Sequence, residues 1–482
     1  MISLIDAGPG TGKTFSLVYG YLSLKREIYG TLSPTEEQQE IFNFITEEFS
    51  PKARVCFFAH SNTNKDTLTA RFGKKGPRVM TFHGEGLSCL IKKYGYQKFV
   101  RNRTEKHIQS ITGYSVSEMS REDKNYWYAI KRILHYLKIE ALEPTEENLA
   151  YLLVKYADLS SYKIPDDWQV DTEELLSRSQ KPDGEVEFAD MVYLGKRSLT
   201  KPRYDLGFVD ESQDVSRSTY QLVTRLCKNV IFCGDKNQAI NAFAGASEEM
   251  YDSIASKSDA ILPLKMTQRC PPHICDLANA IRPGGVTPGP NTLEGDNEKL
   301  SISSLPGKLK ELNPRSVLIL SRTNATIVNT ALYLYKKEVP VKIIDKDLGN
   351  EILNFFKTFK TKDIKTLHRR VNAYEGYHER SRNPLWVQTV KDKAGVCRSL
   401  LNEVSTFKEL EELIGRTFQT EKEGFPLTTV HKAKGLEAPN VFILNPPIEL
   451  PIAMEHPIGR EQEINLHFVA VTRSSQNLYW VV

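Results

Sequence analysis

The feature that most constrains the fold is a short apolar run near the start of the chain that leads straight into a glycine-rich turn. Residues 2–5 predict a buried strand, and the turn and helix start that follow are Ala7, Gly8, Pro9, Gly10, Thr11, Gly12, Lys13 and Thr14. Such a turn aims backbone N–H groups and the positive end of a helix at phosphate groups. Lys13 is then expected to reach the β- and γ-phosphates, and the Thr14 hydroxyl to bind Mg²⁺. The sequence therefore predicts a parallel α/β sheet with a nucleotide at its edge.

A second predicted strand, residues 204–208, is followed by an acidic pair. Asp210 stands where it would complete the coordination of Mg²⁺, and Glu211 is placed to take a proton from an attacking water. Alone, an Asp–Glu pair after an apolar run is usually a solvated strand end, and a glycine-rich turn also arises by chance. The pairing is more specific, because both motifs would lie at the ligand-binding edge of one parallel sheet. Together they indicate nucleotide hydrolysis.

Length and charge add weaker constraints. A chain of 482 residues is too long for one core and predicts roughly two to four domains. The formal net charge is only +4, so composition does not by itself indicate a polyanionic partner. Three basic stretches, residues 98–106, 196–203 and 357–370, are equally consistent with a surface that binds a polyanion and with ordinary solvated surface. No apolar run approaches the length of a membrane span and no leader precedes the first strand, which predicts a cytoplasmic protein.

The seven cysteines are scattered along the chain. The close pairs are Cys227 with Cys233 and Cys270 with Cys275, and neither has a partner pair at the spacing of a metal site. We expect reduced, mostly buried thiols rather than a structural zinc or iron–sulfur cluster.

The order of the expected elements divides the chain into two α/β blocks, each interrupted by a mainly helical insertion. The expected strands are residues 2–5, 55–58, 78–82, 204–208, 230–233, 316–320, 341–344, 427–430, 441–444 and 478–482. Between the strands of the first block, apolar residues recur at helical spacing, as at Ile130, Ile133, Leu134 and Leu137. The expected domains are 1–94 with 190–262, its insertion 95–189, then 263–360 with 425–482, and its reduced insertion 361–424.

Two α/β blocks suggest that the nucleotide binds in the cleft between them. The second block should then contribute positive charge to the γ-phosphate, and the candidates are Arg269 and Arg473. A lone arginine is more often part of a surface ion pair. The residues around both arginines change that expectation.

These residues belong to a series of short elements spread over nearly the whole chain: residues 7–14, 58–65, 81–84, 186–190, 210–214, 234–246, 268–269, 429–437 and 469–473. In this order they resemble the motifs of the UvrD/Rep-type superfamily 1 DNA helicases. The resemblance implies two RecA-like P-loop motor domains with parallel sheets, each carrying a mainly helical insertion. The compact form would suit a viral or phage enzyme.

The resemblance also implies roles at the nucleotide site. Lys13, Thr14 and Asp210 would hold ATP with Mg²⁺, and Glu211 would be the base for water. Gln238 would sense the γ-phosphate. Arg269 and Arg473 would act as arginine fingers, because a planar guanidinium suits the charge on a transferring phosphoryl group. The further nucleotide contacts implied are the other loop residues, Phe15, Gly435 and Glu437, with Glu437 at the ribose hydroxyl.

On the DNA side, Phe243 stands where the family places a base-stacking aromatic. Stacking is worth roughly 1–3 kcal/mol per base and reads no sequence, as movement along arbitrary DNA requires. The ordinary alternative for Phe243 is core packing. Asn62 replaces an aromatic residue, which predicts fewer stacking steps. The expected contacts with the DNA backbone are Thr81, His83, Thr429 and His431.

Other departures from the family concern the base of the nucleotide. The family carries a glutamine-containing adenine motif before the phosphate loop, whereas this chain begins almost at the loop. Gln38 and Gln39 look similar but lie on the other side of the loop. Phe15 and Gln268 replace the usual arginine and tyrosine. We therefore expect relaxed selectivity among nucleoside triphosphates.

Three functions compete. The first is an ATP-driven motor on single-stranded DNA that moves 3′ to 5′ by family analogy and opens single/double-strand junctions. The second is a translocase that displaces bound proteins without processive unwinding. The third is a nucleotide-switched binding protein without real hydrolysis, which the presence of Glu211, Gln238 and both arginines disfavours. The short second insertion predicts a monomer without the self-inhibition of larger relatives, and replication or repair proteins are the expected partners.

Overall fold

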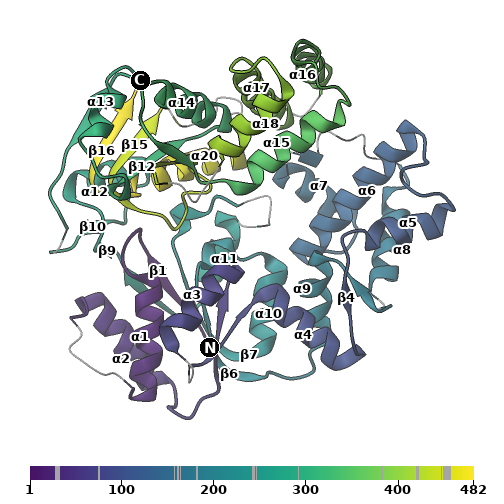
Figure 1. The fold of residues 1–482 in the computed structure, drawn as a ribbon. Helices are drawn as coiled ribbons and strands as arrows, with labels where there is room; N and C mark the ends of the chain where they lie inside the picture. Colours follow the sequence, from purple (N-terminus) through teal and green to yellow (C-terminus); the bar gives the residue numbers. More distant parts are fainter. Residues whose placement is uncertain are drawn as a thin grey trace. The chain divides into compact units, whose positions relative to one another are not determined.

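The computed structural model describes residues 1–27, 33–73, 76–156, 158, 159, 162, 164, 166–180, 183–241, 245, 247–290, 292–381, 384–418, 423–446, 448 and 457–482. The chain divides into two compact units, Met1–Met266 (unit 1) and Thr267–Val482 (unit 2). Each unit is an α/β structure built on its own parallel sheet (Figure 1). The predicted fold class is therefore confirmed.

The sheet of unit 1 has the strand order β3-β2-β6-β7-β1-β8, and its neighbouring strands all run parallel. Its strands are β1 (Ile2–Ala7), β2 (Val55–Ala59), β3 (Arg78–Thr81), β6 (Tyr204–Val209), β7 (Cys227–Gly234) and β8 (Ala260–Leu264). Because β7 lies between β1 and β6, the segments that follow these three strands meet at one edge of the sheet.

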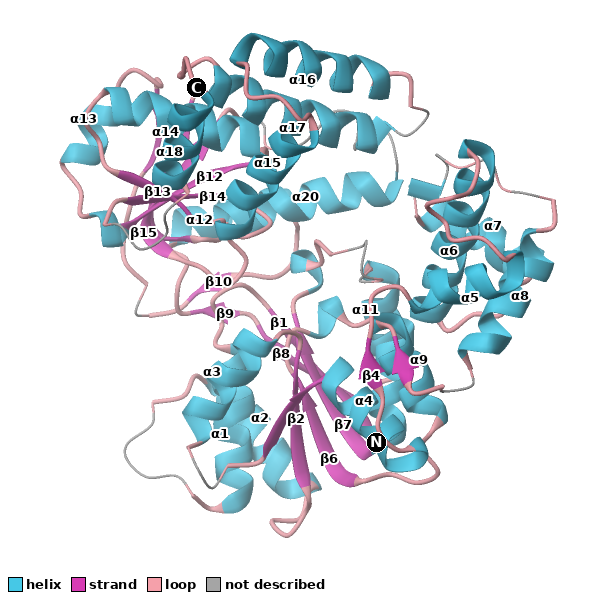
Figure 2. Cartoon of the chain, turned by 45° about the vertical axis from the view of Figure 1, so that its right-hand side comes forward, coloured by secondary structure: helices cyan, strands magenta, loops and turns pink. Residues whose placement is uncertain are grey.

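Both faces of this sheet are covered by helices, which is why its strands are nearly continuous apolar runs (Figure 2). Side chains alternate between the faces, so Ile5 and Phe57 pack in one core while Leu4 and Phe58 pack in the other. The core of Ile5 includes residues of α1 (Lys13–Lys25) and α2 (Glu36–Glu48). The core of Leu4 includes residues of α4 (Phe82–Tyr94), α9 (Phe188–Arg197), α10 (Arg217–Leu226) and α11 (Glu248–Ser256). Helix α3 (Asn62–Phe72) follows β2.

Helices α4 and α9 cross at a contact that only glycine permits. A Cβ atom added to Gly86 would lie 2.2 Å from the carbonyl oxygen of Met191. A Cβ atom added to Gly195 would lie 2.7 Å from the Cα atom of Gly86. The two backbones therefore approach each other directly, and this contact fixes α9 against the sheet domain.

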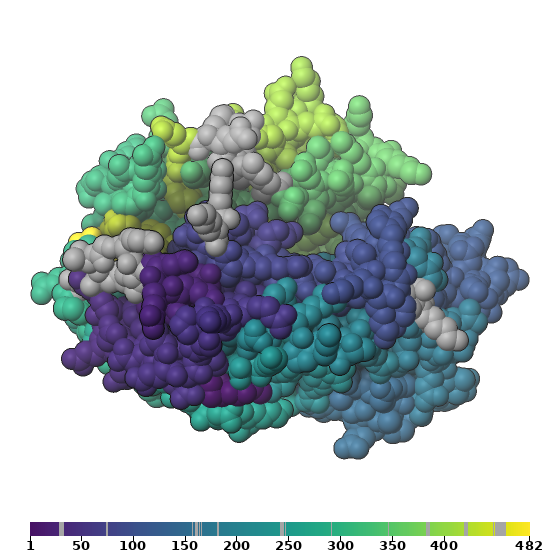
Figure 3. Space-filling view, turned by 90° about the horizontal axis from the view of Figure 1, so that it is seen from below, coloured from purple at the N-terminus to yellow at the C-terminus, as the bar shows by residue number. Residues whose placement is uncertain are grey.

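The segment between α4 and α9 is mainly helical and has a hydrophobic core of its own. Its elements are β4 (Lys98–Phe99), α5 (Arg103–Thr112), α6 (Arg121–Glu140), α7 (Glu146–Lys155), α8 (Trp168–Ser179) and β5 (Glu185–Val186). Ile130, Ile133 and Leu137 of α6 lie in this core with Trp127 and Trp168. In Figure 3 the segment forms the blue-to-teal side of unit 1, opposite the purple N-terminal residues.

The sheet of unit 2 has the order β11-β16-β15-β12-β14-β13, again with all neighbours parallel. Its strands are β11 (Asn297–Leu300), β12 (Val317–Ser321), β13 (Val341–Ile343), β14 (Phe425–Thr429), β15 (Ala438–Leu444) and β16 (Ser474–Val481). A separate two-stranded sheet joins β9 (Met266–Thr267) to β10 (Thr287–Pro288). The helices are α12 (Pro272–Ile281), α13 (Leu305–Lys310), α14 (Asn324–Lys336), α15 (Lys346–Thr358), α16 (Ile364–His378), α17 (Pro384–Leu401), α18 (Phe407–Thr417) and α20 (Pro457–Val471).

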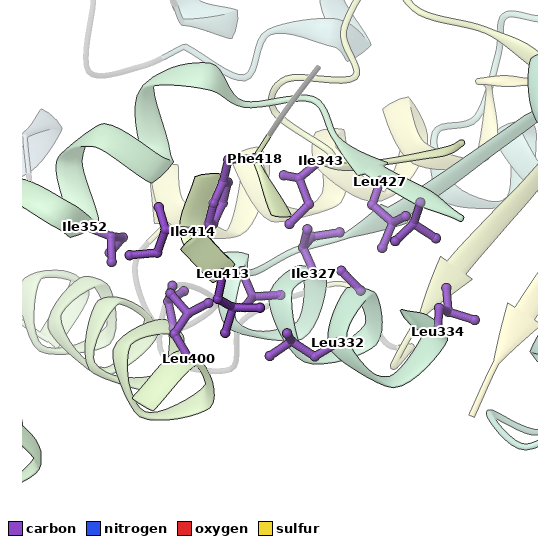
Figure 4. Packing of buried hydrophobic residues seen from close by; sticks show 14 of the residues in the cluster. Ile327, Leu332, Leu334, Ile343, Ile352, Leu400, Leu413, Ile414, Phe418 and Leu427 are labelled. Atoms are coloured by element: carbon purple, nitrogen blue, oxygen red, sulfur yellow. The ribbon is translucent and has the colours of Figure 1, made fainter. Parts of the chain in front are cut away.

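Helices α16, α17 and α18, which come from the expected second insertion, pack into the same core as the sheet of unit 2. In this core Leu413 lies between Leu400 and Ile327 of α14, and Leu427 of β14 belongs to the same cluster (Figure 4). The segment 361–424 therefore shares its hydrophobic core with the sheet domain that carries it, whereas the first insertion has a core of its own.

All seven cysteines are buried, as predicted, and they are free thiols. Among the helices in the described ranges, none combines the length and the apolar character needed to cross a membrane.

Candidate functional site

The phosphate loop between β1 and α1 has the local geometry that its glycines predict. Gly10 and Gly12 have φ of 68° and 83°, in the left-handed region that favours glycine. Gly12 is the N-cap of α1, so the helix begins at Lys13. The hydroxyl of Thr11 donates to the carbonyl of Gly8 at 3.0 Å, and the ammonium of Lys13 donates to the same carbonyl at 3.2 Å. The side chains of Thr11 and Lys13 therefore both bind the carbonyl of Gly8 within the turn.

Thr14 and Asp210 meet at the edge of the sheet although they are 196 positions apart. The Thr14 hydroxyl donates to Oδ2 of Asp210 at 2.8 Å, and the backbone N–H of Glu211 donates to Oδ1 at 3.0 Å. Burial and the neighbouring carboxylate of Glu211 raise the pKa of Asp210 to about 6, against the lowering effects of Thr14 and Lys13. A half-buried hydroxyl beside a buried carboxylate forms the hard oxygen set that suits Mg²⁺.

A chain of hydrogen bonds links Glu211 to Gln238 across the ends of β6 and β7. Gln213 donates from Nε2 to the carboxylate of Glu211, and its Oε1 accepts from the backbone N–H of Asp235 at 3.0 Å. The carboxylate of Asp235 accepts from Nε2 of Gln238 at 2.6 Å. Glu211 has a φ of 56°, a strained value for a non-glycine residue at the turn where its side chain leaves the strand. Thr14, Asp210, Glu211 and Gln238 thus lie in one network, and its other members, Gln213 and Asp235, have no role assigned from the sequence.

The remaining predicted nucleotide contacts of unit 1 flank this network. Ala7 ends β1 and is buried, and Pro9 lies in the turn. Phe15 is in the first turn of α1, where its ring lies 4.3 Å from that of Tyr19 and 6.5 Å from that of Phe42. Phe15 is half-buried by this packing.

Predicted DNA contacts of unit 1 follow β2 and β3, which are neighbours in the sheet. Asn62 is exposed in the first turn of α3. Thr81 caps α4 by accepting from the N–H of Gly84 at 3.1 Å. The ring of His83 stacks on Phe188 with 3.7 Å between centroids, and burial and nearby His60 lower the pKa of His83 to about 4, so this histidine is neutral. Phe188 is exposed and was not among the predicted residues. Phe243 lies outside the described residues.

In unit 2, the two predicted arginines gather around one turn between α20 and β16. Arg269 forms an ion pair with Glu437, and its Nη1 donates to the carbonyl of Thr472 at 3.3 Å. The Nε of Arg269 is buried and has no hydrogen-bond acceptor among the described residues. Arg473 is only 2% exposed, and its Nε donates to the carbonyl of Val469 at 2.9 Å. Both guanidinium groups are therefore held in fixed positions by the backbone of unit 2.

The other predicted residues of unit 2 lie on the turn that follows β14. Thr429 ends the strand, and its carbonyl accepts from the N–H groups of Lys432 and Ala433, both at 3.0 Å. Burial and the charge of Arg322 lower the pKa of His431 to about 3. Gly435 has a φ of 88° and lets the chain turn toward Glu437.

Gln38 contacts the phosphate loop, which its position in the sequence does not indicate. Its Nε2 donates to the carbonyl of Thr11 in the phosphate loop at 3.2 Å, although 27 positions separate the two residues. The local signal was the pair Thr35 and Gln38, which form a capping box at the start of α2. That signal predicts where the helix begins, but not that the turn packs against the loop.

Two protein-family models match this chain. The UvrD/REP helicase N-terminal domain matches residues 2–259, more than half of the chain. The chain belongs to the UvrD-like helicase family. The UvrD-like helicase C-terminal domain matches residues 350–482, and the two matches include both sets of site residues except Arg269.

Relatives in other organisms are similar to this chain at low identity. "F-box DNA helicase 1" of Gallus gallus is 24% identical over 92% of this chain and 48% of its own length. "ATP-dependent DNA helicase HMI1, mitochondrial" of Saccharomyces cerevisiae is 25% identical over 70% of this chain and 50% of its own length. "Probable DNA helicase II homolog" of Mycoplasma pneumoniae is 23% identical over 58% of this chain and 40% of its own length. The chain spans about half the length of the first two and less of the third.

Proposed function

We propose that this chain is an ATP-dependent DNA helicase that hydrolyses ATP at the phosphate loop of unit 1. The observation that carries the proposal is the 2.8 Å hydrogen bond from Thr14 to Asp210, which brings a hydroxyl and a carboxylate together beside Lys13. These are oxygen ligands of the kind that Mg²⁺ prefers. Membership of the UvrD-like helicases supports the same activity, as do relatives named as DNA helicases.

Each residue of the network then has a task in hydrolysis. Thr14 and Asp210 would hold Mg²⁺, which would supply positive charge to the phosphate oxygens. Lys13 leaves the carbonyl of Gly8 and binds the phosphates, while Glu211 orients the attacking water and accepts its proton. Gln238, connected to Glu211 through Asp235 and Gln213, senses the γ-phosphate. Arg269 and Arg473 stabilise the transferring phosphoryl group, as rigid guanidinium groups do in related reactions.

The DNA track proposed for unit 1 starts at the ends of β2 and β3. Asn62 and Thr81 contact the backbone there, and the neutral His83 on Phe188 offers a stacking surface. Thr429 and His431 continue the contacts in unit 2. We assign the direction 3′ to 5′, a single/double-strand junction as the preferred substrate, and a monomer as the active form.

The first experiment measures phosphate release with single-stranded DNA, duplex DNA and RNA in turn. We expect stimulation by single-stranded DNA, and its loss in Lys13→Ala and Glu211→Gln. Tailed duplexes then test direction: strand separation should need a 3′ tail. Failure of the wild type to release phosphate with any nucleic acid would favour a nucleotide-switched binding protein.

A parallel assay separates unwinding from protein displacement. The substrate is a 3′-tailed duplex beside a single strand that carries a tightly bound protein block. A motor that opens the duplex fits the proposal, whereas removal of the block without duplex opening would identify a translocase instead.

The choice of nucleotide base is a separate part of the proposal. Both ends of the Gln38 amide are bound to the protein backbone, at Thr11 and Thr35. We therefore propose relaxed selectivity among nucleoside triphosphates. Comparable turnover of ATP and GTP is expected, and strict selectivity for ATP would contradict this part alone.

A further inference from the structure

The first turn of α2 contains two pairs of like residues, Glu36-Glu37 and Gln38-Gln39, with different surroundings within each pair. Glu36 and Gln39 are exposed, whereas Glu37 is half-buried and Gln38 is 5% exposed. Gln39 donates from Nε2 to Asn43 on the surface of the same helix. The two inward side chains leave α2 and bind backbone elsewhere in unit 1.

Gln38 holds the phosphate loop. Its Nε2 donates to the carbonyl of Thr11 at 3.2 Å, while its Oε1 accepts from the N–H of Thr35 at 3.1 Å. The contact is close, because a Cβ atom at Gly12 would lie 2.9 Å from the same Nε2. The amide of Gln38 therefore sits directly on the turn that is to receive the phosphates, and the capping box fixes its rotamer.

Glu37 holds the last residues of unit 1. Its Oε2 accepts from the backbone N–H of Lys265 at 2.8 Å and from that of Met266 at 2.9 Å. Unit 1 ends at Met266, so these two amides belong to the segment that leads into unit 2. The same segment also binds the loop itself, since the carbonyl of Leu264 accepts from the N–H of Gly8 at 2.9 Å.

We propose that Glu37 and Gln38 form a tether that transmits the nucleotide state of the phosphate loop to residues 264–266. This inference rests on the proposed function of the loop. Adjacent residues of one capped helical turn cannot move independently, so a shift of the loop at Thr11 displaces the acceptor of the Lys265 and Met266 amides. Glu37 and Gln38 are positioning residues, because they contact the backbone of the site rather than the phosphates.

The chain supplies a matched control for each variant. Gln38→Met and Glu37→Met remove the tether bonds at nearly constant volume, and Gln39→Met and Glu36→Met make the same changes on the exposed side of the turn. A thermal melt of each variant establishes that it is folded. If Gln38→Met does not fold, Gln38→Glu replaces it, because this change keeps the size and turns the donor to Thr11 into an acceptor.

The first readout is the affinity for a fluorescent ATP analogue with Mg²⁺. Loss of one buried hydrogen bond predicts that Gln38→Met weakens binding about fivefold. Glu37→Met, Gln39→Met and Glu36→Met should stay within about twofold of the wild type, because Glu37 and Gln39 bind outside the loop and Glu36 is exposed. Equal effects of Gln38→Met and Gln39→Met would overturn the role of Gln38.

The second readout is hydrogen exchange of the Lys265 and Met266 amides, with and without a non-hydrolysable ATP analogue. In the wild type we expect slow exchange that the analogue changes. In Glu37→Met exchange should be fast and unaffected by the analogue, and in Gln38→Met the effect of the analogue should be lost. A helix cap without transmission would lower the melting temperature but leave the response of these amides intact, which would refute the tether.

These measurements do not depend on hydrolysis or DNA. A wild type that binds the analogue and shows the exchange response, but releases no phosphate with DNA, would refute the proposed function and leave the tether standing. A wild type that unwinds DNA, but in which the analogue does not change hydrogen exchange at Lys265 and Met266, would refute the tether and leave the proposed function standing.

Discussion

The charge cluster at the base of the helical insertion gives the sharpest prediction of stability. Asp190 of α9 is 1% exposed and accepts from Nη1 of Arg103 at 2.9 Å and from Nζ of Lys138 at 2.7 Å. Both cations are themselves buried. Burial opposes ionisation of Asp190, but Lys138 and Arg103 outweigh it and lower the pKa of the carboxyl group. The residue joins α5 and α6 of the insertion to a helix of the sheet domain.

Asp190→Asn should destabilise unit 1 strongly. The change keeps the volume but removes the negative charge and one of the two acceptor oxygens, so one charge-assisted hydrogen bond, worth about 1.5–3 kcal/mol, is lost and the other loses its charge. Lys138 is then left buried without a counter-charge, and breaking one partner of a buried ion pair costs about 3–5 kcal/mol. Because asparagine keeps one acceptor oxygen, we expect the free energy of unfolding to fall by about 3 kcal/mol, the lower end of this range.

Urea unfolding at pH 7 measures this loss. Trp127 and Trp168 report on the core of the insertion when Trp386 and Trp480 are replaced by Phe in every variant. The control is Asp183→Asn, since Asp183 also binds Arg103 but its side chain is 52% exposed; its loss should stay below about 1 kcal/mol. Equal losses for the two variants would refute the reasoning.

The pH dependence provides a second check on Asp190. A carboxyl group whose pKa is lower in the folded state stabilises the fold above its unfolded value, and this contribution is lost as the pH falls through the folded pKa. The difference between wild type and Asp190→Asn should therefore be constant from about pH 6 to 8 and shrink below about pH 4.

Three further predictions use other features of the structure. Gly86→Ala should destabilise unit 1 by about 1–3 kcal/mol in the same urea assay, because its Cβ atom would meet the Met191 carbonyl. With Trp386 and Trp480 kept as the reporters of unit 2, Gly376→Ala on the open surface of α16 should stabilise unit 2 by about 0.5–1 kcal/mol. Changes of the same sign in the two variants would contradict both predictions. His431 is neutral in the fold with a pKa of about 3, so stability is lost as the unfolded chain takes up a proton below about pH 6.5. His431→Gln should therefore weaken the dependence of the denaturation midpoint of unit 2 on pH between pH 7 and 4. The same pH dependence in the variant and the wild type would count against this role of His431. Thr14→Ala should raise the Mg²⁺ concentration needed for binding of the ATP analogue about tenfold, and Thr14→Ser should restore it; a Thr14→Ala protein with normal Mg²⁺ dependence would argue against the pairing with Asp210.

Much of unit 1 could be predicted because its signals are local. Gly10 and Gly12 adopt the left-handed conformations that their loop requires, and α1 begins at Lys13 directly after them. The apolar runs became parallel strands because both faces of each sheet are covered, so that consecutive residues such as Phe57 and Phe58 are all buried.

Other features of the fold depend on contacts between elements that are far apart in the sequence. Leu367 and Leu410, in helices expected as a separate insertion, are buried in the core of the unit 2 sheet. A helical periodicity shows that one face is apolar, but it does not identify the surface that covers this face. In the sequence Gln38 follows the phosphate loop instead of preceding it as the family's glutamine does, yet in space its amide lies on that loop.

The sequence by itself determined the class of fold, the phosphate loop and the family motifs, because backbone conformation, strand burial and helix capping depend on residues a few positions apart. Only the tertiary structure decided that Thr14 meets Asp210, that Gln213 and Asp235 connect Glu211 to Gln238, and that α2 binds both the loop and residues 265–266. The strand order placed β7 between β1 and β6 and brought these segments together. Such contacts arise from the packing of whole elements, which residues close together in the chain do not specify.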